Sequence, residues 1–321
     1  MQDRQQTTLA EAGFVKHPVV TRKERFLNEM ERIVPWAEII ALIEPHYPKP
    51  AGSGRRPLGL DRMLRVHFLQ NWYNLSDKGA EEALIEIESM RRFAGFDRGR
   101  ERMPDESTIL QFRRLLEAHG LAEQVFERVR ELLSDRGLMM SEGTIADATF
   151  IHAPESRKNK ARRSDAEMGA GHKGKRSHFG LKAHVGVDKD SRLIHSVAVT
   201  AGNRHESPVS RHLVRGGEKE FWGDSAYASS AKLWLGGLCP GVRSMACRKG
   251  EPNKKLTAED KAWNRSLEPV RCRVEHVFQV MKCRFGFRRV RFKGLAKNRQ
   301  HVFMMCALVN LALAKDRLLA A

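Results

Sequence analysis

A change in hydrophobic pattern near residue 138 constrains the fold more than any other feature of the sequence. Before this point, apolar side chains recur every three or four residues, which is the spacing of one α-helix face. Phe26, Met30 and Ile33 are an example. After it, apolar and polar residues alternate or short apolar runs occur, and both patterns are typical of β-strands. The pattern predicts an all-helical N-terminal domain over 1–138 and an α/β domain over 139–321.

The same reasoning places individual elements along the chain. In the first domain the predicted helices are 22–43, with a break at Pro35, then 61–73, 108–116 and 121–133; the third begins at the capping-box form of Thr108. In the second domain the predicted strands are 143–151, 179–187, 193–200, 220–227 and 242–247. Further helices are predicted over 208–214, over 257–283 with an interruption near Pro269, and over 298–319. This order favours a mixed sheet covered by helices.

Charge divides the chain at the same place. Residues 1–138 contain 22 Lys and Arg and 22 Asp and Glu, so the whole net charge of +18 lies in residues 139–321. A charge so unevenly distributed is typical of a domain that binds a polyanion such as nucleic acid. We therefore expect the second domain to contact DNA.

Two segments concentrate this positive charge. Residues 155–177 are polar and poor in apolar side chains, and we expect them to form a mobile loop. The cations expected to contact DNA from this loop are Arg157, Lys158, Lys160, Arg162, Arg163, Lys173, Lys175 and Arg176. The second segment, 271–299, contains ten basic residues and a single acid, Glu275.

Several classes of protein are excluded. The five cysteines form no C-x-x-C pair, so neither a disulfide framework nor a zinc finger is predicted. The longest apolar stretch, 302–314, is too short to cross a membrane, and residues 1–6 do not resemble a signal peptide. The histidines between 152 and 205 lack the tight spacing of metal ligands, and strand alternation and solvent exposure explain them. We expect a cytoplasmic protein that does not bind membranes.

Three acids occupy unusual positions in the basic domain. Asp147 interrupts an apolar strand, Asp224 ends another, and Glu275 stands in the most cationic segment. Hard divalent cations prefer oxygen ligands, and a carboxylate cluster can hold two of them for phosphodiester cleavage. Helical spacing predicts Arg271 and Lys282 on the same face as Glu275, where they could hold phosphates. Taken singly, each acid could instead cap a turn or form an ion pair.

These residues form motifs that resemble one known family. Residues 147–154 (DATFIHAP) resemble a first-aspartate motif, 224–227 (DSAY) a second, and Arg271, Glu275 and Lys282 the YREK signature. Further similar segments are 178–188, 200–205, 54–57, 67–76 and 89–93. In these motifs the chain resembles the transposases of bacterial insertion sequences of family five, which have a DDE triad. The tyrosine of YREK is replaced here by Glu268, so its supporting contact is in question.

The resemblance implies a ribonuclease-H-like catalytic domain and a DNA transposase. Such an enzyme binds terminal inverted repeats of double-stranded DNA, hydrolyses the element ends and joins the 3′-hydroxyls to target DNA. Asp147, Asp224 and Glu275 would be the catalytic residues and would hold Mg²⁺, with Mn²⁺ as a substitute. A homodimer or a larger synaptic complex, associated with the bacterial nucleoid, is implied as well.

Two alternatives remain open at the level of sequence. One is a metal-dependent endonuclease that cuts without joining, and the other is a DNA-binding regulator derived from a transposase. The intact triad argues against the regulator, because a pure DNA-binding protein needs no buried strand carboxylate. Trp222 and Trp263 could stack on bases, although packing in the core is the commoner role of a tryptophan.

Overall fold

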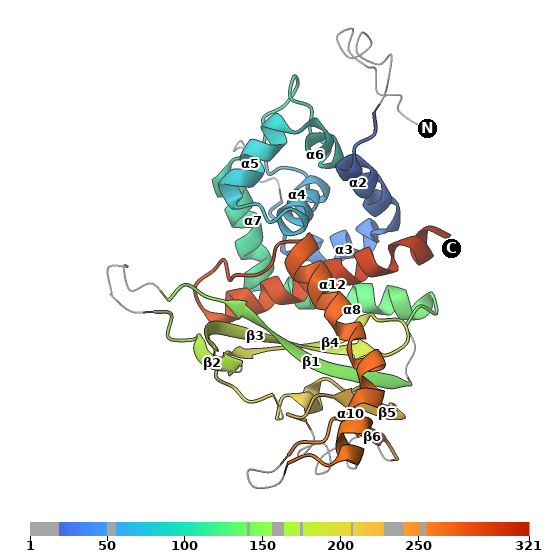
Figure 1. Cartoon of the computed structure of the whole chain (residues 1–321). Coiled ribbons are helices and arrows are strands. Elements are labelled where there is room, and N and C mark those ends of the chain that lie inside the picture. Colours follow the sequence, from blue (N-terminus) through green and yellow to red (C-terminus); the bar gives the residue numbers. More distant parts are fainter. Residues whose placement is uncertain are drawn as a thin grey trace.

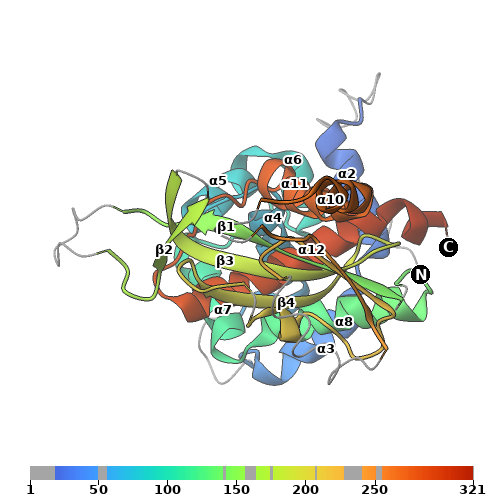
Figure 2. The same cartoon turned by 60° about the horizontal axis from the view of Figure 1, so that its bottom comes forward.

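The computed structural model describes residues 19–49, 56–139, 142–155, 164–173, 176–206, 208–227, 241–250 and 255–320. Figure 1 shows a group of helices stacked above a mixed β-sheet, with α8 and α12 between this group and the strands. The elements β5, β6 and α10 lie at the opposite end of the molecule. Figure 2 views the molecule from below, with β1, β3 and β4 side by side.

The N-terminal part is helical, as predicted. Its α-helices are α2 (Arg22–Ile33), α3 (Trp36–Ile43), α4 (Leu60–Trp72), α5 (Asp77–Glu86), α6 (Glu88–Phe93), α7 (Glu106–Ala118) and α8 (Leu121–Asp135), with a 3-10 turn at Glu44–His46. The predicted break at Pro35 is confirmed, because α2 ends at Ile33 and α3 begins after the proline. Proline cannot donate a backbone hydrogen bond, which ends the first helix here.

Two details of the helical part differ from the prediction. The helix α7 begins at Glu106 instead of Thr108, because the Asp105 side chain accepts a hydrogen bond from the Thr108 N–H (2.8 Å) and caps the helix. The helices α5 and α6 lie outside the predicted elements. The buried face of α5 consists of Ala80, Ala83 and Leu84, whose small side chains give a weak periodic signal.

The sheet contains antiparallel and parallel strands. Its members are β1 (Gly143–His152), β2 (Gly169–Lys173), β3 (Arg176–Asp188), β4 (Ile194–Ala201), β5 (Glu220–Gly223) and β6 (Arg243–Ala246). The pairs β1–β3 and β3–β4 are antiparallel, whereas β1–β5 and β5–β6 are parallel. The principal strand order is therefore β4-β3-β1-β5-β6. This mixed order is that of a ribonuclease-H-like sheet, and the predicted fold class is confirmed.

The strands β2 and β4 share one edge of β3. β2 pairs with the first residues of β3, from Arg176 to Gly180, and β4 pairs with the following residues, from Leu181 to Val187. The expectation of an irregular loop over 155–177 is therefore wrong for 169–173 and for 176–177, which are paired in the sheet. Residues 156–163 and 174–175 of that segment lie outside the described residues.

The C-terminal helices complete the fold. They are α10 (Ala258–Arg271), α11 (Arg273–Gln279), a π-helical turn (Val280–Arg284) and α12 (Leu295–Ala320). The interruption predicted near Pro269 lies slightly later, because α10 continues through the proline and ends at Arg271. The helix predicted over 208–214 is wrong: a single 3-10 turn, Ser210–His212, occupies this position.

The helix α12 packs on both parts of the molecule. It contacts α8, α2 and α4 of the helical part and β4 of the sheet. Its residues from Val302 to Leu311 are buried without exception, so one hydrophobic core runs from the N-terminal helices to the sheet. The boundary between 138 and 139 remains a prediction from composition.

Candidate active site

Asp147 lies on β1, at the centre of the sheet. The Ala148 N–H donates a hydrogen bond to its Oδ1 atom (2.7 Å). Burial raises the pKa of Asp147 from 3.8 to about 7; the bond from Ala148 lowers this pKa, and the negative charge of Asp224 raises it further. The ionised form of Asp147 is thus unfavourable in the protein without a bound cation, at the position that stands out in the sequence.

The parallel pairing of β1 and β5 brings Asp224 beside Asp147. Ile145 on β1 pairs with Trp222 on β5, and the two aspartates come two residues later in each strand direction. The negative charge of Asp224 acts on Asp147, so the two carboxylates lie near each other. β5 ends at Gly223, and a hydrogen bond from the Ala226 N–H to Oδ1 of Asp224 (2.8 Å) forms the turn that follows.

Glu275 is placed differently from the two aspartates. It lies on α11, which contacts β1, and its side chain is exposed. Within the described ranges, no three His, Cys, Asp or Glu side chains converge closely enough to hold a metal ion. The structure therefore brings together Asp147 and Asp224, and the membership of Glu275 in the same site stays a prediction.

The two cations predicted beside Glu275 contact different strands. Nη1 of Arg271 donates to Sγ of Cys247, just after β6 (3.1 Å), and the positive charge of Arg271 lowers the pKa of Asp147. Nζ of Lys282 donates to the Phe150 carbonyl oxygen on β1 (2.7 Å). α10 ends at Arg271 and Lys282 belongs to the π-helical turn, so the shared face with Glu275 stays a prediction.

Most cations of the basic segment 155–177 lie outside the part of the chain that the structure describes. Arg157, Lys158, Lys160, Arg162, Arg163 and Lys175 lie outside the described residues. Lys173 ends β2 and Arg176 begins β3, where their backbones pair with each other. Their contact with DNA remains a prediction.

Sequence reasoning missed Glu206. Its negative charge raises the pKa of Asp147 and also that of the buried Tyr227, for which burial is the larger cause. Glu206 forms an ion pair with Nζ of Lys182 on β3 (3.0 Å). One sequence signal could have identified Glu206: it directly follows the segment 200–205, which resembles the transposase family. The region around Asp147 is therefore more acidic than the two aspartates make it.

The histidines and tryptophans have structural contacts. Solvent exposure does not explain His184 and His195, which are buried: His184 hydrogen-bonds to Thr200 (2.9 Å) and His195 to Thr144 (3.0 Å). Trp222 is buried and its Nε1 donates to Glu220 (3.2 Å); Trp263 is half-buried and donates to the Ala246 carbonyl (3.4 Å).

Comparison with known families agrees with this arrangement. Residues 139–311 match the model of the transposase DDE domain, and residues 16–115 match that of a transposase domain (DUF772). The chain belongs to the DDE transposase family. It is therefore a DNA transposase, and membership of this family implies dependence on a divalent metal ion. The helical part and the ribonuclease-H-like sheet each correspond to one of the two matches.

A solved transposase is similar over much of the chain. It is the cryo-EM structure of a piggyBac transposase synaptic complex with hairpin DNA, with 12% sequence identity and a TM-score of 0.43 over 91% of this chain and 73% of the other. No helix in the described part of this chain is long and apolar enough to span a membrane.

Proposed function

We propose that this transposase hydrolyses phosphodiester bonds at the ends of an insertion sequence and joins the freed 3′-hydroxyls to target DNA. The observation that carries the proposal is the pair formed by Asp147 and Asp224. Asp224 directly follows β5, which pairs with β1, and its charge raises the pKa of Asp147. Two carboxylates held together against their own repulsion are a typical cation site.

The donor set fits a divalent metal ion. Carboxylate oxygens are the ligands that Mg²⁺ prefers, and a cation beside Asp147 would offset both its burial and the repulsion from Asp224. Asp147 and Asp224 would hold the ion, and Glu275 is proposed as a third ligand because α11 contacts β1. A bound Mg²⁺, or Mn²⁺ in its place, supplies charge stabilisation at the phosphate and lowers the pKa of the attacking water or hydroxyl.

The remaining residues position the DNA. Arg271 lies close enough to Asp147 for its charge to act there, and its guanidinium suits a phosphate beside the carboxylates. Lys282 bonds to the Phe150 carbonyl and so holds the π-helical turn against β1, near the predicted phosphate path. The excess positive charge of residues 139–321 supports double-stranded DNA as the partner, both the inverted repeats and the target.

The proposed reaction needs two DNA ends at once. Joining both ends of one element to a single target requires two active sites held at a fixed separation. A homodimer or larger synaptic complex, associated with the nucleoid, is therefore part of the proposal.

A strand-transfer assay tests the function. The full-length protein is incubated with Mg²⁺, linear DNA that carries the element ends and a plasmid target, and joined products are resolved on a gel. The proposal expects cleavage at the ends and joined products with the natural protein, and neither with Asp147→Ala. Cleavage without joining would identify an endonuclease, and binding without cleavage a DNA-binding regulator; either result would overturn the proposal.

A further inference from the structure

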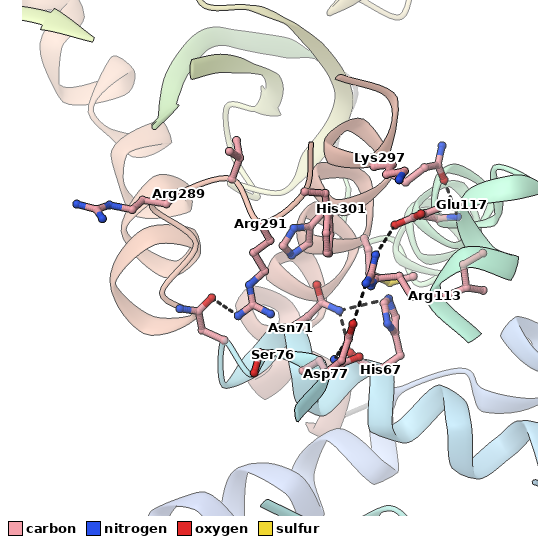
Figure 3. A pocket seen from close by; sticks show the side chains of 18 of the residues that line it. His67, Asn71, Ser76, Asp77, Arg113, Glu117, Arg289, Arg291, Lys297 and His301 are labelled. Atoms are coloured by element: carbon pink, nitrogen blue, oxygen red, sulfur yellow. Dashed lines mark hydrogen bonds and ion pairs between the residues drawn. The ribbon is translucent and has the colours of Figure 1, made fainter. Parts of the chain in front are cut away.

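A cavity lies between the helical part and the catalytic part, and neither Asp147 nor Asp224 lines it. Its volume is about 630 Å³, within the range of about 300 to 1,000 Å³ that is common for small-molecule sites. It is lined from α4, the start of α5 and α7 on one side, and from the segment 286–292 and α12 on the other. Figure 3 shows Arg113, Arg291 and His301 converging on this space above His67 and Asn71.

Residues at the floor of the cavity contain buried polar atoms that lack hydrogen-bond partners among the described residues. His67, Asn71 and His301 are 8%, 3% and 9% exposed. Oδ1 of Asn71, Nε of Arg113 and Nδ1 of His301 have no hydrogen-bond partner among the described residues. Leaving buried polar groups unpaired opposes folding, so a native structure retains them where a ligand or water completes the set. Asn71 thus has an unused acceptor, Oδ1, and Arg113 an unused donor, Nε–H, and both residues line the same cavity.

The orientation of the Asn71 side chain is fixed by its own contacts. Its Nδ2 donates to the backbone carbonyl of His67 (2.8 Å), so this atom must be the amide nitrogen and the unpaired atom must be the oxygen. Asn71 therefore has a carbonyl oxygen that can accept a hydrogen bond from an amino group. The ring of His301, which also lines the cavity, contacts the rings of Phe287 (4.4 Å between ring centroids) and Phe292 (5.4 Å).

The charge of the lining is positive. Five cations line the cavity against two carboxylates: Arg113, Arg288, Arg289, Arg291 and Lys297 against Asp77 and Glu117. Both carboxylates are bound to one cation, because Arg113 donates to Asp77 (2.8 Å) and to Glu117 (3.0 Å).

The other cations differ in where they point. Arg291 hydrogen-bonds to two neutral oxygens, Oδ1 of Asn74 and the Leu75 carbonyl, and burial lowers its pKa. Lys297 is exposed at the rim, whereas Arg289 extends away from the cavity (Figure 3). Arg291 and Lys297 are therefore the cations best placed to meet an anionic group that enters.

We infer that this cavity binds a single nucleotide unit, with its phosphate toward Arg291 and Lys297 and its base against Asn71, Arg113 and the ring of His301. The cations require an anionic group, and the floor requires a flat ligand that carries both a donor and an acceptor. A nucleobase has both properties. A paired base of a duplex has its edges and faces covered, so the nucleotide is either free or an unpaired residue of a DNA strand.

Calorimetry and thermal unfolding of the full-length protein test the inference with deoxyadenosine monophosphate as the probe. We expect saturable binding at one site and a higher Tm, weaker binding of inorganic phosphate, and weaker binding of deoxyadenosine. Lys297→Gln should weaken binding of the nucleotide about fivefold at low salt, since it removes one exposed charge contact. Arg291→Gln should weaken it about tenfold or more, since this cation is half-buried.

Two control variants separate this cavity from other basic surfaces. Lys261→Gln removes an exposed lysine of α10 that does not line the cavity, and it should leave nucleotide binding unchanged. Arg271→Gln should also leave it unchanged. The inference is overturned if the nucleotide gives neither heat nor a Tm increase, if Lys297→Gln and Arg291→Gln both bind normally, or if Arg271→Gln abolishes binding. Lys297→Gln changes an exposed side chain, so misfolding is not expected to obscure its result.

Competition experiments identify the source of the nucleotide. If the site takes an unpaired nucleotide of DNA, a duplex with a single-stranded overhang should displace the bound nucleotide and a blunt duplex of equal length should not. If the site takes a free nucleotide, neither duplex should displace it. Neither the binding nor the competition measurement requires catalysis. A failure of nucleotide binding can therefore be distinguished from a failure of strand transfer.

Discussion

Asp147 shows how a single residue can sacrifice stability for function. It lies on the central strand, where burial and the charge of Asp224 both raise its pKa to about 7. A neutral side chain of the same shape would suit this position better in the absence of a cation. The position therefore makes sense for a side chain selected to hold a cation.

Replacing Asp147, Asp224 or Glu275 individually with alanine should reduce end cleavage in Mg²⁺ by at least about a thousandfold. When catalytic residues act as one unit, loss of any one of them removes most of the activity. Binding to an end oligonucleotide, measured by fluorescence anisotropy, should remain, since phosphate contacts are made by other residues. In the same set, Asp147→Asn should raise the Tm of the metal-free protein because it removes a buried charge. A Glu275→Ala protein that cleaves normally would show that the third ligand is another residue.

Buried histidines should make the protein sensitive to mild acid. Burial lowers the pKa of His67 and of His184 to about 4 from the usual 6.5, so the unfolded chain binds more protons than the folded one between these values. The free energy of unfolding should be intact above pH 6.5, fall as the pH decreases, and lose on the order of 3 kcal/mol per histidine by pH 4. Urea unfolding at pH 7.5, 6 and 5 measures this loss.

Two histidine variants test the cause of the acid sensitivity. His184→Gln should remove its own share of the dependence on pH between 6.5 and 5, a range above the titration of most carboxylates, and leave the share of His67. His46→Gln changes an exposed histidine and should leave the dependence as it is. A free energy of unfolding that stays constant from pH 7.5 to 5 in the natural protein would contradict the proposed linkage.

At the scale of elements, the sequence predicts what depends on local pattern. The break at Pro35 and the central strands follow from the fixed φ of proline and from period-two alternation. Elements that depend on tertiary contacts are missed: β2 is polar in sequence and forms because β3 offers an unpaired edge. In the same way, Asp147 and Asp224 stand out in the sequence, whereas the nearness of Glu206 and the cavity around Arg291 arise from segments brought together by folding.

The start of α7 provides a direct test at this scale. The Asp105 side chain caps the helix by accepting from the Thr108 N–H, and the hydrogen bonds from the side chain and the N–H of Thr108 hold the pKa of Asp105 well below its usual value. Asp105→Ala should lower the free energy of unfolding by about 1 kcal/mol, as loss of an N-cap usually does. Thr108→Ala is the matched variant, and it should cost less because it removes the side-chain bond to Asp105 but keeps the backbone N–H bond of the cap. Urea unfolding of both variants decides; a larger loss for Thr108→Ala would restore the capping box predicted from the sequence.

At the scale of the whole molecule, α12 joins the helical part and the sheet in one hydrophobic core, and we expect the two to unfold together. Its apolar side chains face α8 on one side and β4 on the other, within a single core. The connection also has a polar component. The buried side chain of Asn310 accepts a hydrogen bond from the Ile194 N–H (2.8 Å) and donates one to the Ile194 carbonyl (2.7 Å), which fixes α12 to the first residue of β4. Loosening α12 should therefore weaken both parts.

Asn310→Leu tests this coupling. The variant leaves the N–H and the carbonyl of Ile194 buried without partners, so the free energy of unfolding should fall by about 2 to 5 kcal/mol. Hydrogen exchange measured on amides of α8 and of β4 should show both groups losing protection by a similar factor, because the two parts unfold together. Asp316→Asn alters a side chain of the same helix that is 90% exposed, and it should change neither. If β4 alone lost protection in Asn310→Leu, the helical part would be an independent folding unit, and α12 would serve the sheet without coupling the two.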